Sequence, residues 1–335
     1  MKKNVFTMIT IALISMVLFS CSSKRNPEIG LLMGTLELER WQKDTSHFVS
    51  YAKEKGASVI VRNAENNQGT QIQQAERLIN GGVDVLVVVP VDQNISAEIV
   101  RLAHDHDIKV IAYDRLIRQC DLDYYVSFDN VKIGELQASY ITNIQPNGKY
   151  ALIGGPTSDN NSIMLRLGQI NVLSPYIERG DIEIIYDNFA NSWDKNSGKL
   201  EMEKCLSKHH QNIDAVIAAN DALAEGIAEA IEEHKLNRKI LLTGQDAELE
   251  ACQRIIQGKQ TMTVYKPIRR LAQVASEVAC KFAKREQVGT VNQTTLYNGN
   301  AMVPSILLEP ITVHRQNIQL TVLMDDYQQE EKIFK

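Results

Sequence analysis

From residue 28 onward, short apolar runs alternate with longer segments in which apolar residues recur at helical spacing. The runs EIGLLMG, SVIVRNA, VDVLVVVP and KVIAYD are rich in Val, Ile and Leu and predict strands. Because these runs are continuous rather than alternating, we expect both faces of each strand to be buried, as in a parallel sheet. The segments between them predict helices from about Glu39 to Lys55, from Gln68 to Asn80 and from Ile95 to His106.

The same order starts again after the run YYVSFDN. KYALIGGP, IEIIYDNFA, DAVIAAN and KILLTGQD predict strands that are each followed by a helical segment, and QTMTVYKP predicts a further strand. Alternation of strands and helices is typical of βαβ units. We therefore predict an α/β protein with two doubly wound, parallel-sheet halves, the first ending near Asn130. No Gly/Ser-rich or Pro-rich linker separates the halves, which indicates two lobes joined by a hinge.

Residues 1–20 have the layout of an export signal. Lys2 and Lys3 precede an apolar run, Val5 to Phe19, which is shorter than the ~20 residues of a membrane-spanning helix. The run closes as LFSC, similar to a bacterial lipobox, so we expect a lipoprotein signal peptide over 1–20, lipidation of Cys21 and a tether over 21–27. Such an anchor attaches a protein to a membrane surface without crossing it. The alternative is plain cleavage after Ser20, because the bulky Phe19 departs from the usual lipobox pattern.

Composition and motifs exclude several classes of function. The 335 residues hold 36 Lys and Arg against 41 Asp and Glu, a formal charge of −5, which argues against nucleic-acid binding. The motifs of serine hydrolases, phosphate-binding loops, zinc proteases and dinucleotide-binding folds are absent, so we expect no enzyme activity, cofactor or metal. Four cysteines beyond Cys21 are widely spaced and show no metal-binding pattern: Cys120, Cys205, Cys252 and Cys280. The last three fall in amphipathic helical patterns, which favours buried free thiols, although the pairing of all four stays open.

Candidate binding residues follow the predicted strands. In open parallel sheets, ligands bind beyond the carboxyl ends of the strands. Polar and aromatic side chains occur there in both halves: Arg40 and Trp41, Asp114 and Arg115, Asp159 and Asn161, Trp193, Asn220, Asp246, and Lys266. Carboxylates, amides and cations exchange hydrogen bonds with hydroxyls, and an indole offers an apolar face to a sugar ring. Mixed charges without an excess of one sign favour a neutral ligand rich in hydroxyls.

Each candidate also has a structural interpretation. An Asp or Asn after a strand is commonly a helix N-cap. Asp114 and Arg115 are adjacent and suit a local salt bridge. Trp41 shares a helical face with Phe48 and Ala52, which favours a core position. The occurrence of such residues after strands in both halves is what favours a site.

Several of these stretches resemble one family. LERWQKD, GVDVLVVVP, VIAYDRLI, GGPTSDNN, ANDA, GQDAE and QTMTVYKPI are similar to the D-xylose-binding proteins of ABC sugar importers, which belong to the type I periplasmic binding proteins. The resemblance extends from about residue 28 to 325. It departs before LERW, where the family usually carries acidic residues and this chain has Met33 to Glu37. That departure leaves the contacts of lobe closure and any second ligand preference open.

The resemblance implies a three-segment hinge, near 127–130, 265–267 and 302–305. It divides the chain into an N-terminal lobe of 28–128 plus 267–303 and a C-terminal lobe of 129–266 plus 304–335. It also implies that Trp41 and Trp193 stack on the two faces of a sugar ring. Hydroxyls would then be bound by Arg40, Asp114, Arg115, Asp159, Asn161, Asn220, Asp246 and Lys266.

The function implied is capture of D-xylose, or a close aldopyranose, by lobe closure. The protein would be a lipid-anchored monomer on the periplasmic or cell-surface side of a bacterial membrane and would deliver its sugar to an ABC permease. An alternative is a sugar sensor that docks on a membrane histidine kinase or chemoreceptor. A LacI-type regulator is less favoured because residues 1–27 hold an export signal and no helix-turn-helix, and a secreted glycosidase requires a pair of carboxylates flanking the scissile bond.

Overall fold

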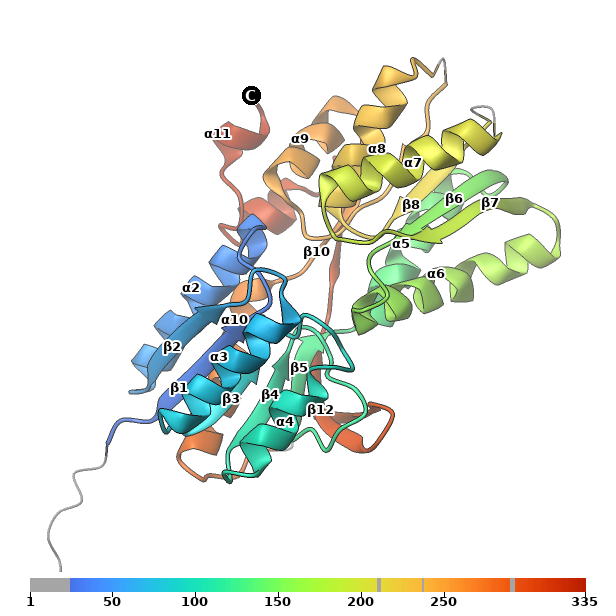
Figure 1. Cartoon of the computed structure of the whole chain (residues 1–335). Coiled ribbons are helices and arrows are strands. Elements are labelled where there is room, and N and C mark those ends of the chain that lie inside the picture. The colour runs from blue at the N-terminus through green and yellow to red at the C-terminus, as the bar shows by residue number, and fades with distance from the viewer. Residues whose placement is uncertain (1–24, 210–211, 237, 290–292) are drawn as a thin grey trace, which may run out of the picture.

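The chain folds into two α/β lobes that lie next to each other and are connected on one side (Figure 1). The computed structural model describes residues 25–209, 212–236, 238–289 and 293–335. The expected signal peptide and Cys21 lie outside the described residues. No helix within the described ranges is long and apolar enough to cross a membrane.

The first lobe is built on a sheet of seven strands, ordered β11-β12-β5-β4-β3-β1-β2. All neighbours are parallel except the edge pair β11 and β12, an antiparallel hairpin that the sequence did not predict. The strands are β1 (Glu28–Met33), β2 (Ser58–Asn63), β3 (Val85–Val88), β4 (Lys109–Tyr113), β5 (Tyr124–Phe128), β11 (Thr294–Tyr297) and β12 (Met302–Leu308).

Helices cover both faces of this sheet. One face carries α2 (Glu39–Glu54) and α10 (Ile268–Ala283), and the other carries α3 (Gln68–Asn80) and α4 (Ala97–His104). Successive side chains of a strand point to opposite faces, so Leu31 packs toward α2 and α10 while Leu32 packs toward α3 and α4. This two-sided burial confirms the expectation for the inner strands β1, β3, β4 and β5, whereas the edge strand β2 is only partly buried.

The second lobe repeats the arrangement on a smaller parallel sheet, ordered β7-β6-β8-β9. Helices α5 and α6 cover one face and α7 and α8 the other. The elements are α5 (Asn130–Ile144), β6 (Gly148–Gly154), α6 (Asn160–Glu178), β7 (Ile182–Phe189), α7 (Lys195–His209), β8 (Ala215–Ala218), α8 (Asp221–Glu233), β9 (Leu241–Leu242) and α9 (Leu249–Gln257).

The chain passes between the lobes three times. The first two passages follow β5 and β10 (Thr263–Tyr265). The third was expected near 302–305, but Ser305–Leu308 pair with β5 inside the first sheet, so the chain leaves this lobe only after Leu308. It then forms β13 (Ile311–Val313), which pairs antiparallel with β10, a π-helical turn (Gln319–Leu323) and α11 (Glu330–Ile333) beside α9. The lobe boundary is therefore near residue 309 rather than at 303/304.

The cysteines of the described residues are free thiols. Cys205, Cys252 and Cys280 are buried on helices α7, α9 and α10, and Cys120 is half-buried. Burial raises the pKa of Cys205 to about 12, so this thiol stays protonated and behaves as a small apolar residue.

Candidate functional site

All ten candidate residues line one cavity between the lobes, together with Leu38 and Gln245. The cavity has a volume of about 20 Å³, which is room for about one water molecule. The carboxyl ends of the strands of both sheets face it, as the strand-end argument requires. In this conformation the surrounding side chains contact one another directly across the cleft.

Two aspartates occupy equivalent places in the two lobes. Asp114 follows β4 with a φ of 62°, and Asp246 follows the short β9 with a φ of 100°. The backbone N–H of Asp114 donates to Val126 O at 2.8 Å, and that of Asp246 donates to Val264 O at 2.8 Å. Non-glycine residues in this backbone region are strained and cluster at functional sites. The same strained turn in both lobes directs a carboxylate into the cleft.

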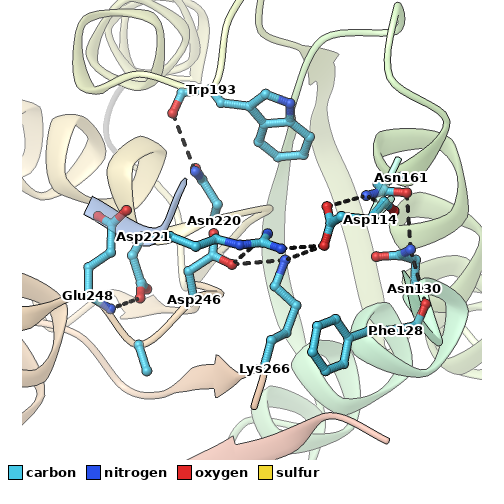
Figure 2. Close-up of polar contacts among 12 residues, drawn as sticks. Asp114, Phe128, Asn130, Asn161, Trp193, Asn220, Asp221, Asp246, Glu248 and Lys266 are labelled. Carbon is cyan, nitrogen blue, oxygen red and sulfur yellow. Dashed lines mark hydrogen bonds and ion pairs between the residues drawn. The ribbon is translucent and has the colours of Figure 1, made fainter. Parts of the chain in front are cut away.

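Arg40 and Lys266 hold these two carboxylates. Arg40 bonds Asp114 through Nη2 and lies 3.4 Å from Asp246 Oδ1 through Nη1. The Lys266 ammonium is 2.9 Å from Asp246 and 4.0 Å from Asp114, so it lies between the two (Figure 2). Behind this cluster, Asp44 accepts from Arg40 Nε at 3.2 Å one helical turn away.

Burial and charge act in opposite directions on this cluster. Burial by itself raises the pKa of the Asp114 carboxyl, yet Arg40 and Lys266 outweigh it and hold that pKa below its usual range. Burial lowers the pKa of Arg40, but Asp114, Asp246 and Asp44 raise it well above its ordinary value. Asp114 and Arg40 are therefore both charged at neutral pH.

A second cluster centres on Asp159, at the start of α6. Its Oδ2 is 2.8 Å from Arg115 Nε of the first lobe and accepts from Trp193 Nε1 at 3.1 Å. Asp159 also caps α6 by accepting from Asn161 N at 2.9 Å. Asn220 likewise caps α8 by accepting from Leu223 N and donates to Trp193 O at 3.3 Å (Figure 2). The capping interpretation is thus correct for both residues, and both line the cavity as well.

The two tryptophans meet the cavity in different ways. Trp41 is 2 % exposed and belongs to the core cluster beneath α2, while the guanidinium carbon of Arg40 lies 4.2 Å from its ring centre. Trp193 is half-buried and its ring lies against Gly155, where a Cβ would collide with it. Trp41 therefore combines a core role with a place in the cavity wall.

Several side chains of the site escaped the sequence reasoning. Gln245 directly precedes Asp246, so the rule that ligands bind beyond strand ends would have reached it if it had been applied one residue earlier in the sequence. Leu38 is the residue before α2. Asn130, at the first passage between the lobes, donates to Asn161 Oδ1 at 3.0 Å. Asp44 carried no signal, because its partners Arg40 and Tyr113 come together only in the fold.

The chemistry of the cavity is polar and close to neutral overall. Three cations, Arg40, Arg115 and Lys266, line it together with three buried carboxylates, those of Asp114, Asp159 and Asp246, and a fourth, Asp44, lies behind Arg40. Charged groups that neutralise one another leave hydrogen-bonding capacity without a large net field. The described residues contain no group of His, Cys, Asp and Glu side chains arranged to hold a metal ion.

Comparisons with known proteins agree with this architecture. The sequence profile of the family described as "Periplasmic binding protein domain" matches residues 29–287. The chain is 43 % identical to the D-xylose-binding periplasmic protein of Haemophilus influenzae, covering 96 % of each chain. It is 44 % identical to the D-xylose-binding periplasmic protein of Escherichia coli, covering 91 % of this chain and 92 % of that one.

Solved structures point the same way. A solute-binding protein of an ABC transporter from Clostridium phytofermentans, with bound β-D-glucose, superposes with a TM-score of 0.85 at 28 % identity. The match covers 91 % of this chain and 99 % of that one. These relatives are binding proteins rather than enzymes. The chain therefore belongs to the type I periplasmic binding proteins, in the group that includes the D-xylose-binding periplasmic proteins.

Proposed function

We propose that this chain captures an aldopyranose, with D-xylose as the first candidate, in the cavity between its lobes. The observation that carries the proposal is that carboxylates, amides, cations and two indoles from both lobes line a single cavity. Such groups exchange hydrogen bonds with hydroxyls and present apolar faces to a sugar ring. The names of the two relatives above 40 % identity favour D-xylose.

Capture would proceed by closure of the lobes. A cavity of about 20 Å³ is too small for a pyranose, so the lobes must separate before the sugar enters. The sugar then takes the place of direct contacts across the cleft, such as that between Arg115 and Asp159. Because it touches both lobes only when they are closed, it shifts the balance toward the closed form by its differential affinity.

The closed form would deliver the sugar to an ABC permease on the periplasmic or cell-surface side of a membrane, with a lipid at Cys21 as the anchor. A sensor that docks on a histidine kinase or chemoreceptor is the runner-up. Neighbouring genes discriminate the two, since a permease and an ATPase support transport and a kinase supports sensing. Mass spectrometry of the membrane-extracted protein tests the lipid.

Calorimetry tests the binding itself. Protein starting at residue 22 is titrated with D-xylose, ribose, glucose, galactose and arabinose, and we expect saturable binding of D-xylose. Lys266→Met should remove most of the affinity, because it takes a buried cation from between two carboxylates. Lys132→Met, at an exposed lysine of α5, is the matched control and should bind like the wild type. Absence of heat with all five sugars would refute the proposal.

A further inference from the structure

Gln245 is buried, and its side-chain oxygen accepts no hydrogen bond from the described residues of the protein. The residue is 4 % exposed and lines the cavity. Its Oε1 is enclosed and has no hydrogen-bond partner within the part of the chain that the structure describes. An enclosed acceptor without a donor is unfavourable, so such an atom in a ligand cavity needs an explanation.

Other buried glutamines of this chain show what a structural role looks like. Gln71 Oε1 accepts from Val91 N at 3.0 Å, and Gln137 Oε1 accepts from Gln169 Nε2 at 2.9 Å. Gln260 Oε1 accepts from Arg254 Nε at 3.0 Å. Each of these oxygens has a partner, whereas that of Gln245 has none within the described residues. Gln93 Oε1 is also unpaired there, but Gln93 does not line the cavity and its Nε2 donates to Thr157 O at 2.7 Å.

The backbone around Gln245 is nevertheless firmly held. Its carbonyl accepts from Asp221 N at 2.9 Å, and the N–H of the next residue, Asp246, donates to Val264 O at 2.8 Å. On the other side, Gly244 O accepts from Gln137 Nε2 at 3.0 Å. The side chain is therefore not needed to fix this turn, and the turn holds the backbone from which the side chain reaches the cavity wall. A residue whose backbone is held by its surroundings is suited to recognising a ligand, because less order is lost on binding.

We propose that Gln245 is a specificity-determining contact whose amide oxygen accepts a hydrogen bond from one hydroxyl of the bound sugar. This inference rests on the proposed function and deepens it, since it assigns a donor requirement to one position of the ligand. A site that hydrogen-bonds a hydroxyl rejects an analogue lacking it, because the buried polar group is then left unpaired. The residue thus discriminates among sugars of similar size.

The proposed contact between Gln245 and a sugar hydroxyl is tested by changing the residue and the ligand separately and together. Binding of D-xylose and of its 2-, 3- and 4-deoxy analogues is measured for the wild type and for Gln245→Leu, which keeps the bulk and removes the oxygen. We expect D-xylose to bind about fivefold to tenfold more weakly to the variant, the range of one net hydrogen bond. One deoxy analogue, and only one, should lose no further affinity from the substitution.

The pattern across analogues separates the outcomes. Equal weakening of every analogue would assign Gln245 a packing role and overturn the inference, as would unchanged binding of D-xylose. Gln245→Met, which keeps the unbranched chain, repeats the cycle if the leucine variant melts at a lower temperature. A wild type that binds none of these sugars would refute the proposed function instead, which is a different result.

Discussion

At the scale of single residues, the two tryptophans both present an indole to the cavity, but one lies in the core of a lobe and the other in a loop. Trp41 is part of the core of the first lobe and is almost fully enclosed. Trp193 lies in a loop, and its ring packs against the backbone at Gly155. Helical spacing and resemblance gave two different interpretations of Trp41, and the structure supports its core packing and its position in the cavity wall together.

The two residues should therefore respond differently to truncation. Trp41→Ala should lower the free energy of unfolding by about 3–5 kcal/mol, as for large aromatic residues of a core, and weaken sugar binding too. Trp193→Ala should weaken binding while costing far less stability, because the side chain is half-buried. Urea unfolding without ligand and calorimetry with D-xylose measure the two effects. An equal loss of stability in both variants would contradict this assignment.

At the scale of elements, glycines set the spacing of the helix pairs in the second lobe. A Cβ at Gly168 of α6 would collide with the backbone carbonyl of Val131 on α5, and one at Gly134 of α5 would collide with that of Leu165. The helices therefore meet backbone to backbone, and no side chain can move aside to make room. This contact positions the start of α6, where Asp159 and Asn161 line the cavity.

Gly168→Ala should consequently destabilise the protein. We expect the free energy of unfolding to fall by about 1–3 kcal/mol, the usual cost of overpacking, because only a shift of a whole helix relieves the collision. Gly69→Ala on α3 is the matched control: its Cβ would meet nothing closer than 3.4 Å, and alanine favours a helix over glycine. Thermal unfolding of the two variants compares them, and similar melting temperatures would contradict the backbone contact.

Asp221 links three elements, and its carboxyl makes the free energy of unfolding depend on pH. At the start of α8 it accepts from Gln260 Nε2 and Thr263 Oγ1, both at 2.8 Å, and from Glu248 N at 3.1 Å. Burial raises the pKa of this carboxyl to about 7, with Arg254 opposing the shift. The folded state therefore keeps the proton over a range where the unfolded chain has already lost it.

The sign of the effect follows from that difference. Between about pH 4 and pH 7 the folded state binds more protons at Asp221, so the free energy of unfolding falls as pH rises, by up to about 4 kcal/mol. Asp221→Asn should remove this decline and gain stability relative to the wild type toward pH 7. Urea titrations at several pH values test it, with the exposed Asp121→Asn as control. Parallel curves for Asp221→Asn and the wild type would contradict the assignment.

At the scale of the whole molecule, the site exists only where the two lobes meet. Arg115 and Asp114 of the first lobe contact Asp159 and Asn161 of the second, and Gln93 Nε2 donates to Thr157 O at 2.7 Å across the same cleft. These contacts involve few residues, and three apolar clusters lie within a single lobe, one in the first and two in the second. The cluster beneath α2 and α10 also includes Leu165, Ala190 and Leu223 of the second lobe. Separation of the lobes therefore leaves three of these four clusters intact.

Sugar binding should accordingly change the overall dimensions of the protein. Small-angle scattering with saturating D-xylose should give a smaller radius of gyration than without it, because the sugar favours the closed form. Lys266→Met with D-xylose is the control and should keep the ligand-free radius. A wild type that binds D-xylose in calorimetry without any change in radius would contradict closure as the mechanism.

The sequence by itself determined the order of strands and helices up to β10, the two doubly wound halves and ten of the twelve residues that line the cavity. These features are local: continuous apolar runs reflect strands buried on both faces, and the geometry of a parallel sheet brings the residues after its strands to one edge. Only the tertiary structure decided the third passage after Leu308, because it depends on the pairing of β12 with β5. The partners of Arg40, the approach of α5 to α6 at Gly134 and Gly168, and the unpaired oxygen of Gln245 were likewise decided there, since each depends on residues brought together from distant parts of the chain.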